Sequence, residues 1–353
     1  MAEQDKYVRD AQAASSRFVL DRTVEPSVLL ARERKNVTIS VPDLTAEIYG
    51  GPEAARRRIE LYRKVASHPE IKVDDMMFMT REQLYARALK NDMALHAAYS
   101  EFGATELREQ LLIKYQLSYP MPGDVHVNMF TVTLESQCDD EQAKYWVPLA
   151  KSRQIMGAYA QTEIGHGTFL RGIETTATFL PATDEFVFHS PTPSSLKWWP
   201  GGLGKTATHC VLVARLLLAG KDLGPQTFVI QLRDMKTHAM LPGVECGDIG
   251  PKFGYNSLDN GFLRLDHYRA PRSCMLARYA HVTRDGKFVK PPHAKANYGT
   301  MVFIRQGIVD MAGLILAKAV TIAVRYSCVR LQGEPPVRKG AIWSSFVLTN
   351  DVN

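Results

Sequence analysis

Residues 157–168 read Gly-Ala-Tyr-Ala-Gln-Thr-Glu-Ile-Gly-His-Gly-Thr, and the pattern of the chain changes at this stretch. Before residue 153 apolar residues recur at helical spacing, whereas from Ile155 onward they cluster in short runs of strand-forming residues. Hydroxyl and amide side chains on a strand, followed by glycines that permit close backbone approach, suit the edge of a flat ring. The stretch predicts either a ligand-binding strand or a surface turn with two structural glycines, and alone it favours neither.

A helix is predicted to begin at Thr80. This threonine is followed three residues later by Gln83, which together form a capping box that satisfies two otherwise unpaired backbone donors. Gly103 follows the last expected turn as a C-cap. The apolar residues between them fall at i, i+4 intervals and are expected to form one buried line: Tyr85, Leu89, Met93 and Ala97.

Two more helices are predicted around residues 105–117 and 139–153, and Pro148 is expected to kink or divide the second. Residues 1–45 are polar and irregular, and we expect an extended arm there. An α-helical N-terminal domain is therefore assigned to residues 46–153.

The region after Ile155 predicts a sheet. Turn residues separate its apolar runs, and no helical window lies between them, which favours an antiparallel sheet or barrel over residues 154–280 instead of a doubly wound fold. The runs are Thr175–Phe179, Glu185–His189, Cys210–Leu218, Thr227–Leu232 and Phe262–Leu265.

The helical period returns from about Tyr298 to Gln332. We assign residues 281–332 to the first part of a C-terminal α-helical domain and residues 333–353 to a divergent tail. A lone long helix needs partners, supplied by another subunit or by a longer chain. The predicted fold class is α+β multidomain, with an N-terminal α-helical domain, a central antiparallel β-barrel-like domain and the start of a C-terminal α-helical domain.

The composition is that of a globular protein. Of the 353 residues 45% are hydrophobic and 23% are charged, which excludes a disordered tail and a coiled coil. The net charge of +6 is spread over short basic runs such as Arg56–Arg58, unlike the concentrated charge of nucleic-acid binders. The most apolar late stretch carries Lys318, and no run is expected to reach the ~20 residues of a membrane span. These features predict a soluble protein.

The five cysteines argue against two kinds of cross-link. They are odd in number and never form a CxxC arrangement, so neither a disulfide framework nor a structural zinc site is expected. A reducing, intracellular compartment follows, and no metal is predicted.

Residues 195–206 read Ser-Leu-Lys-Trp-Trp-Pro-Gly-Gly-Leu-Gly-Lys-Thr. Paired indoles can wall one side of a flavin, with Gly201 letting the backbone reach its edge. Alternatively Trp198 and Trp199 are core aromatics. Gly204-Lys205-Thr206 ends like a phosphate loop, and Gly202-Leu203-Gly204 with Ala207 imitates a dinucleotide fingerprint. Both motifs require a helix directly after the glycines, but a strand-like run follows here. We therefore interpret both as decoys, that is, as chance matches and not as nucleotide-binding loops.

Together these segments resemble the peroxisomal acyl-CoA oxidases, which are relatives of the acyl-CoA dehydrogenases. The resemblance extends over residues 29–332. The residues of the two motifs quoted above favour the oxidases over the dehydrogenases. It also includes Gly247-Asp248-Ile249-Gly250-Pro251-Lys252-Phe253-Gly254, Asp259-Asn260-Gly261, Asn297-Tyr298-Gly299-Thr300-Met301-Val302 and Arg325-Tyr326-Ser327.

The resemblance implies a homodimeric flavoenzyme that desaturates fatty acyl-CoA to trans-2-enoyl-CoA and passes electrons to oxygen, producing hydrogen peroxide in peroxisomal β-oxidation. It implies FAD contacts at Tyr159, Ala160, Gln161, Thr162, Gly167, Thr168, Gly201 and Arg330. It implies acyl-CoA contacts at Lys295, Ala296, Asn297, Tyr298 and Arg305. Read without the resemblance, Arg330 is a snorkelling helix residue, and Lys295 and Arg305 are solvated charges.

The resemblance also implies a catalytic glutamate in the C-terminal helical region, beyond residue 353. Glu163 is not expected to replace it, because in the family pattern that residue belongs to the cofactor loop. No Ser-Lys-Leu-type peroxisomal signal ends the sequence. It therefore reads as a truncated isoform, a partial gene model or a degenerate copy. Two alternatives stay open: a non-catalytic relative that binds FAD or acyl-CoA, and an acyl-CoA dehydrogenase with a protein electron acceptor.

Overall fold

The computed structural model describes residues 24–117, 119–290 and 299–330. Two compact units are present, one formed by residues 61–309 and the other by residues 1–60 together with 310–353. Helix α4 (Pro52–Ser67) and helix α9 (Gly299–Ser327) each begin in one unit and end in the other.

The expected extended arm is wrong for residues 26–45. Helices α2 (Pro26–Lys35) and α3 (Val41–Tyr49) lie there, and each carries a proline in its first turn, where a missing N–H costs no helical hydrogen bond. The Ser40 side chain caps α3 by accepting a hydrogen bond from the Asp43 N–H, and Gly50 ends the helix in a left-handed conformation. These local stop and start signals outweigh the polar composition.

The larger unit begins with helices. They are the last turns of α4, α5 (Arg81–Glu101), α6 (Leu107–Gln116), a π-helical turn (His126–Thr131), α7 (Val132–Gln137) and α8 (Asp140–Lys151). The capping box of Thr80 and Gln83 is confirmed, and Gly103 follows the C-cap residue Phe102 with a left-handed φ of +65°, as expected of a glycine that ends a helix. Helix α8 runs undivided through Pro148.

The predicted apolar line on α5 is not its buried face. Met93 is 63% exposed, whereas the buried residues are Ala88, Asn91, Asp92, Leu95 and Ala98. Asn91 donates to the Lys72 carbonyl at 2.8 Å, and Asp92 accepts from the Gly123 N–H at 3.0 Å. Because these polar side chains find partners on other segments, they occupy the core side, which apolar periodicity cannot reveal.

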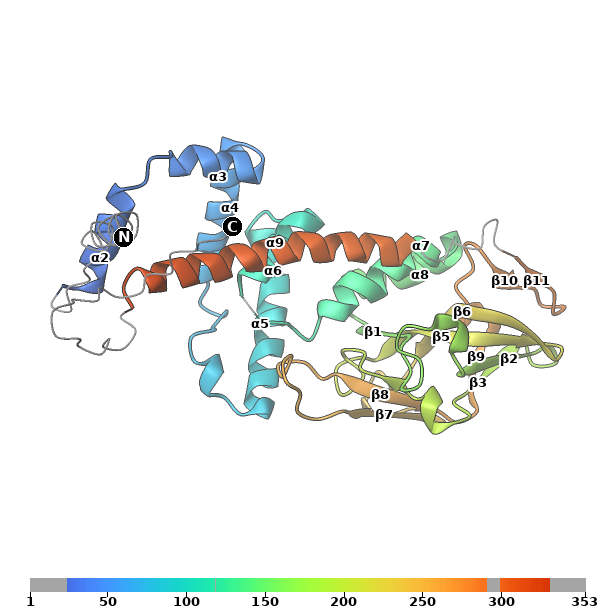
Figure 1. The fold of residues 1–353 in the computed structure, drawn as a ribbon. Coiled ribbons are helices and arrows are strands. Elements are labelled where there is room, and N and C mark those ends of the chain that lie inside the picture. The colour runs from blue at the N-terminus through green and yellow to red at the C-terminus, as the bar shows by residue number, and fades with distance from the viewer. Residues whose placement is uncertain (1–23, 118, 291–298, 331–353) are drawn as a thin grey trace, which may run out of the picture. The chain divides into compact units, whose positions relative to one another are not determined.

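The central sheet has six strands. Its order is β1-β5-β2-β3-β9, with β6 on the other edge of β5, and all five predicted runs are strands (Figure 1). The strands are β1 (Gly157–Ala160), β2 (Thr176–Leu180), β3 (Glu185–His189), β5 (His209–Leu218), β6 (Lys221–Gln231) and β9 (Tyr268–Pro271).

The expectation of a purely antiparallel sheet is wrong at one place. β1 and β2 both pair with β5 in parallel and follow one another along the same edge of it. Ala160 pairs with Leu212, and Thr176 pairs with Arg215. The two partners on β5 are three residues apart, whereas Ala160 and Thr176 are sixteen residues apart in the chain. Residues 161–175 therefore leave the sheet as a loop and return to the same edge.

Two smaller β-structures complete this unit. A three-stranded sheet has the order β4 (Lys197–Trp198), β8 (Gly261–Leu265) and β7 (Val244–Asp248), and β10 (His281–Val282) pairs with β11 (Phe288–Val289). The core of the six-stranded sheet contains Phe186, Phe188 and Phe228, which are fully buried. Both Phe186 and Phe188 meet Phe228 edge to face, with centroids 5.1 Å apart.

Helix α9 lies within the predicted helical region 298–332. Its segment Arg305–Ser327 has 23 residues and contains an 18-residue window with a mean hydropathy of 1.9, so it is long and apolar enough to cross a membrane by length and composition. The expectation that no run reaches that length is wrong, because few charged residues interrupt this helix. One such helix is weak support for a membrane span, since core helices of soluble proteins have the same character.

Candidate functional site

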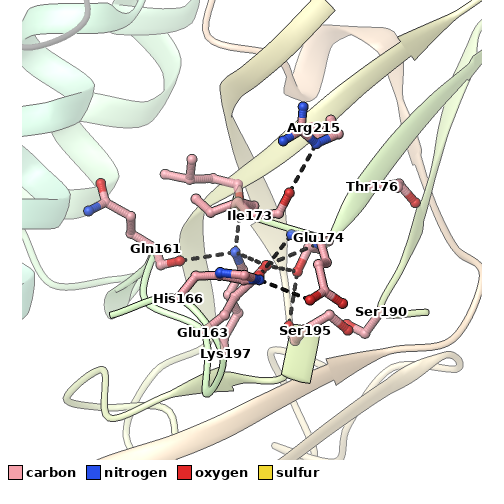
Figure 2. Close-up of polar contacts among 12 residues, drawn as sticks. Gln161, Glu163, His166, Ile173, Glu174, Thr176, Ser190, Ser195, Lys197 and Arg215 are labelled. Atoms are coloured by element: carbon pink, nitrogen blue, oxygen red, sulfur yellow. Dashed lines mark hydrogen bonds and ion pairs between the residues drawn. The ribbon is translucent and has the colours of Figure 1, made fainter. Parts of the chain in front are cut away.

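The motifs at residues 157–168 and 195–206 lie side by side. The Trp198 N–H donates to the Thr162 carbonyl at 3.0 Å, and Glu163 forms an antiparallel bridge with Lys197. The Lys197 ammonium also donates to the Gln161 carbonyl at 3.1 Å (Figure 2). The stretch around Thr162 and the Lys197–Trp198 segment therefore lie next to each other.

A buried ion pair fastens the 161–175 loop to the sheets. Lys197 and Glu163 have 0% of their side chains exposed, and their charged atoms are 2.9 Å apart. The ammonium also donates to the Val213 carbonyl of β5 at 2.7 Å. Burial lowers the pKa of Lys197 to about 8, although the nearby Glu163 carboxylate opposes this shift.

The Glu163 carboxylate closes the loop on itself. Its Oε1 accepts from the backbone and hydroxyl of Thr175, at 3.0 and 2.6 Å, and its Oε2 accepts from the Glu174 N–H at 2.8 Å (Figure 2). Because Glu163 is the third residue of the loop and Thr175 is its last, this one side chain joins the start of the loop to its end. Its oxygens are committed to structure.

A second polar cluster fixes the outer part of the loop. Glu174 accepts from Ser194 at 2.9 Å, and it contacts the His166 ring nitrogen at the same distance. A hydrogen bond from Thr192 is the largest of the effects that lower the pKa of the Glu174 carboxyl. From β5, Arg215 donates to the Ile173 carbonyl at 3.0 Å. The outer part of the loop is thus held mainly by hydrogen bonds from its own and neighbouring side chains.

The predicted residues of this loop fall into two groups. Tyr159 and Ala160 lie on β1 with buried side chains, so a ligand meets chiefly their backbone. Gln161 and Thr162 are partly exposed, and Thr168 is exposed. Within the described residues, the side-chain NH₂ of Gln161 and the hydroxyls of Thr162 and Thr168 have no hydrogen-bond partner, so they are available to a ligand.

The two predicted glycines differ in their surroundings. A methyl group added to Gly167 meets no atom within 4 Å, which leaves room for a close approach. At Gly201 the added methyl lies 3.0 Å from Cγ2 of Val125, so packing against the helical layer already requires a small residue there. The structure thus supplies a structural reason for Gly201 beside the functional one.

The paired indoles differ in exposure. Trp198 is half-buried and stacks on Phe262, which is also half-buried, with centroids 6.1 Å apart, so it lies outside the buried core that the core-aromatic alternative expected. Trp199 is 50% exposed and adopts a φ of +88°, a conformation that costs about 1–3 kcal/mol for a bulky residue. Hydrogen bonds hold it there, from its own N–H to Gly261 and from Asn260 to its carbonyl. An aromatic face held by a strained backbone is typical of a ligand-binding site.

The remaining predicted residues are not part of the 161–175 loop. Arg330 belongs to the smaller unit, where its guanidinium donates to the Tyr326 hydroxyl at 3.0 Å. Arg305 is an exposed residue of α9, and residues 295–298 lie outside the described part of the chain.

The apparent nucleotide loop is filled by the protein itself. One carboxylate oxygen of Asp259 accepts the N–H groups of Lys205 and Thr206, at 2.8 and 2.7 Å, and the Thr206 hydroxyl at 2.9 Å. The segment leads into strand β5 instead of a helix. The interpretation as a decoy is confirmed.

Sequence reasoning missed His126. This buried residue accepts the Gly157 N–H on Nδ1 at 3.0 Å, and its Nε2 donates to the Ala150 carbonyl at 2.9 Å. Burial lowers its pKa to about 4, so the ring is neutral at pH 7. His126 thereby joins the end of α8 to the start of β1. It lies in a π-helical turn, for which no pattern in the sequence gave a signal.

A helical layer, a mixed sheet and a cofactor-type loop between two collinear strands define the acyl-CoA dehydrogenase-like class of fold. Family models agree: "Acyl-coenzyme A oxidase N-terminal" matches residues 40–156, and "Acyl-CoA oxidase, C-alpha1 domain" matches residues 298–342. The chain belongs to the acyl-CoA oxidase family. The second match extends past residue 332 to residue 342, into the region assigned to a divergent tail.

Three known proteins show the extent of the similarity. Peroxisomal acyl-coenzyme A oxidase 1 of Pongo abelii is 45% identical over 307 residues, which are 86% of this chain and 46% of that protein. The structure of Arabidopsis thaliana acyl-CoA oxidase 1 superposes with a TM-score of 0.83 at 41% identity, covering 90% of this chain and 48% of that one. Acyl-CoA oxidase-2 of Caenorhabditis elegans, solved with FAD, ascaroside-CoA and ATP, gives 0.82 at 41% identity over 92% and 49%. The chain thus spans about half the length of these relatives.

Proposed function

We propose that this chain forms the FAD-binding part of a peroxisomal acyl-CoA oxidase. The observation that carries the proposal is the juxtaposition of the 161–175 loop with the Lys197–Gly201 segment, joined by the hydrogen bond from Trp198 to Thr162. The relatives support it, because they are acyl-CoA oxidases and one was solved with FAD and an acyl-CoA.

The residues of the loop fit a flavin. An isoalloxazine needs hydrogen-bonding groups along one edge and open space against its face. Gln161, Thr162 and Thr168 offer side-chain groups without partners among the described residues, Gly167 leaves room, and Trp199 exposes an aromatic face. Gln161, Thr162, Gly167 and Thr168 would hold FAD, which would supply the redox chemistry of the reaction, hydride acceptance and reoxidation by oxygen.

The protein's own part is to orient the ligand and to move a proton. The Glu163–Lys197 pair fixes the loop that carries Thr162, so the binding groups are preorganised. Glu163 does not act as the base, because both of its oxygens are already bound by donors. We propose that a glutamate outside the described residues removes the α-proton, as the family resemblance implies.

The other predicted contacts belong to the same proposal. We assign Arg330 to the FAD pyrophosphate, since a guanidinium binds phosphate oxygens in bidentate fashion. Lys295–Tyr298 and Arg305 are assigned to the acyl-CoA. A location in the peroxisome is proposed from the name of the relative, and a homodimer is proposed from the family resemblance alone.

Flavin titration tests the site. FAD is added to the purified chain while the quenching of flavin fluorescence and the absorbance near 450 nm are followed. Thr162→Val should weaken binding, because it removes a hydroxyl and keeps the side-chain shape. Thr178→Val, at a threonine of β2 outside the loop, is the matched control and should leave affinity unchanged. Equal affinities of the two variants would remove Thr162 from the site.

Turnover distinguishes the three candidate functions. Peroxide release with palmitoyl-CoA and oxygen indicates an oxidase, and dye reduction without oxygen uptake indicates a dehydrogenase. Bound flavin without either indicates a non-catalytic relative. Because general-base catalysis contributes about 10²–10⁴ in rate, we expect the isolated chain to bind FAD weakly and turn over little. Robust peroxide production by this chain would contradict that expectation.

A further inference from the structure

Two histidines and an aspartate meet where the two sheets adjoin. His189 ends β3 of the six-stranded sheet, and Asp266-His267 is the turn between β8 and β9. The backbone fixes this juxtaposition, because the Ser190 N–H donates to the Leu265 carbonyl at 2.8 Å and the Leu265 N–H donates to the Ser190 hydroxyl at 3.1 Å. Both of these anchoring residues are buried.

The side chains converge on one point. Nδ1 of His267 lies 2.7 Å from Oδ1 of Asp266, and Nδ1 of His189 lies 3.7 Å from the same oxygen. The two imidazole rings stack with centroids 4.1 Å apart. Nδ1 of His189 is shielded from solvent and has no hydrogen-bond partner, although such buried nitrogens are normally satisfied.

We propose that His189, Asp266 and His267 bind a divalent transition-metal ion, with Zn²⁺ as the best fit. Imidazole nitrogen and carboxylate oxygen are preferred zinc ligands, and an exposed site leaves the fourth position to water. It is the one group of three such side chains with atoms within 4.8 Å of one another among the described residues.

The distances allow this with a small rearrangement. Neighbouring ligands of tetrahedral zinc lie about 3.4 Å apart, for bonds of about 2.1 Å. The His189–Asp266 separation is already close to this value, and the His267 nitrogen must move outward by less than ~1 Å. Its side chain is 69% exposed, so this movement meets little resistance.

The ion gives an unused nitrogen a partner and ties the two sheets together at this end. The sequence does not predict this site, because a zinc motif is recognised in a sequence by closely spaced ligands. Here His189 and Asp266 are far apart in the chain and become neighbours only through the pairing of their strands.

Calorimetric titration with ZnCl₂ tests the site on the full chain, without an affinity tag, after chelation, desalting and alkylation of accessible thiols. Three variants remove one ligand each: His189→Gln, Asp266→Asn and His267→Asn. The last replacement suits the backbone, because His267 has a φ of +54° and asparagine tolerates this region. The control is His238→Asn, an exposed histidine outside the cluster with a similar φ of +60°.

We expect one Zn²⁺ per chain, with each cluster variant weakening binding at least about tenfold and His238→Asn leaving it unchanged. Zn²⁺ should also raise the melting temperature of the unmodified chain and the control, but not of the cluster variants. Circular dichroism confirms that each variant is folded. Absence of saturable binding, or equal binding by folded cluster variants, overturns the proposal.

Discussion

The buried ion pair of Lys197 and Glu163 makes the sharpest stability prediction. Lys197→Met keeps a flexible side chain of similar length but removes the ammonium. The Glu163 carboxylate keeps its three other donors, yet it loses its counter-charge inside the protein, and the carbonyls of Gln161 and Val213 lose a donor. Both side chains of the pair are fully buried, so solvent cannot compensate.

Removing one partner of such a pair typically costs about 3–5 kcal/mol of stability, which raises the unfolding equilibrium constant by about 10²–10⁴-fold. The assay is urea unfolding followed by tryptophan fluorescence, because Trp198 and Trp199 adjoin the substituted residue. The control Lys221→Met, at an exposed lysine of β6, should change the free energy of unfolding by less than about 0.5 kcal/mol.

The double variant Lys197→Met with Glu163→Gln isolates the charge. It replaces both ions by neutral groups, so it should recover about 1 kcal/mol or more relative to Lys197→Met alone. The reasoning is refuted if Lys197→Met costs less than about 1 kcal/mol or if the double variant is no more stable than the single one.

Three further predictions concern two buried histidines and two glycines of the larger unit. His126 and His209 have pKa values lowered from 6.5 to about 4 by burial, so the unfolded chain binds more protons between these values and stability falls as the pH drops. At pH 5 the free energy of unfolding should be about 2 kcal/mol lower per histidine than at pH 7.5. His126→Gln should therefore flatten the dependence of the urea midpoint on pH. A variant profile as steep as that of the unmodified chain would contradict this prediction. Gly157→Ala places a methyl group 2.0 Å from the Phe130 ring and should destabilise by about 1–3 kcal/mol or more, measured as a lower urea midpoint. Gly167→Ala meets nothing and should leave the urea midpoint unchanged while weakening FAD binding, whereas unchanged FAD affinity would argue against a ligand beside residue 167.

Much of the local structure follows from residues close together in the chain. The capping box of Thr80 and Gln83 and the helix end at Gly103 formed as predicted, because a helix end is satisfied by groups within about four residues. The five strand runs formed for a similar reason, since alternation and turn residues are local signals. The resemblance to the acyl-CoA oxidases was visible in the residues of the two glycine-rich motifs, 157–168 and 195–206, without any structure.

Only the tertiary structure decided which distant groups meet. The buried face of α5 was mispredicted because Asn91 and Asp92 are satisfied by residues on other segments. The loop between β1 and β2, the Glu163–Lys197 pair and the cluster at His189 all depend on how strands register against β5 and β8. Register is a property of the assembled sheet, because a hydrogen-bond ladder pairs residues whose separation along the chain is arbitrary. The amino-acid sequence by itself determined the element types and the family, and the assembled sheets determined the site.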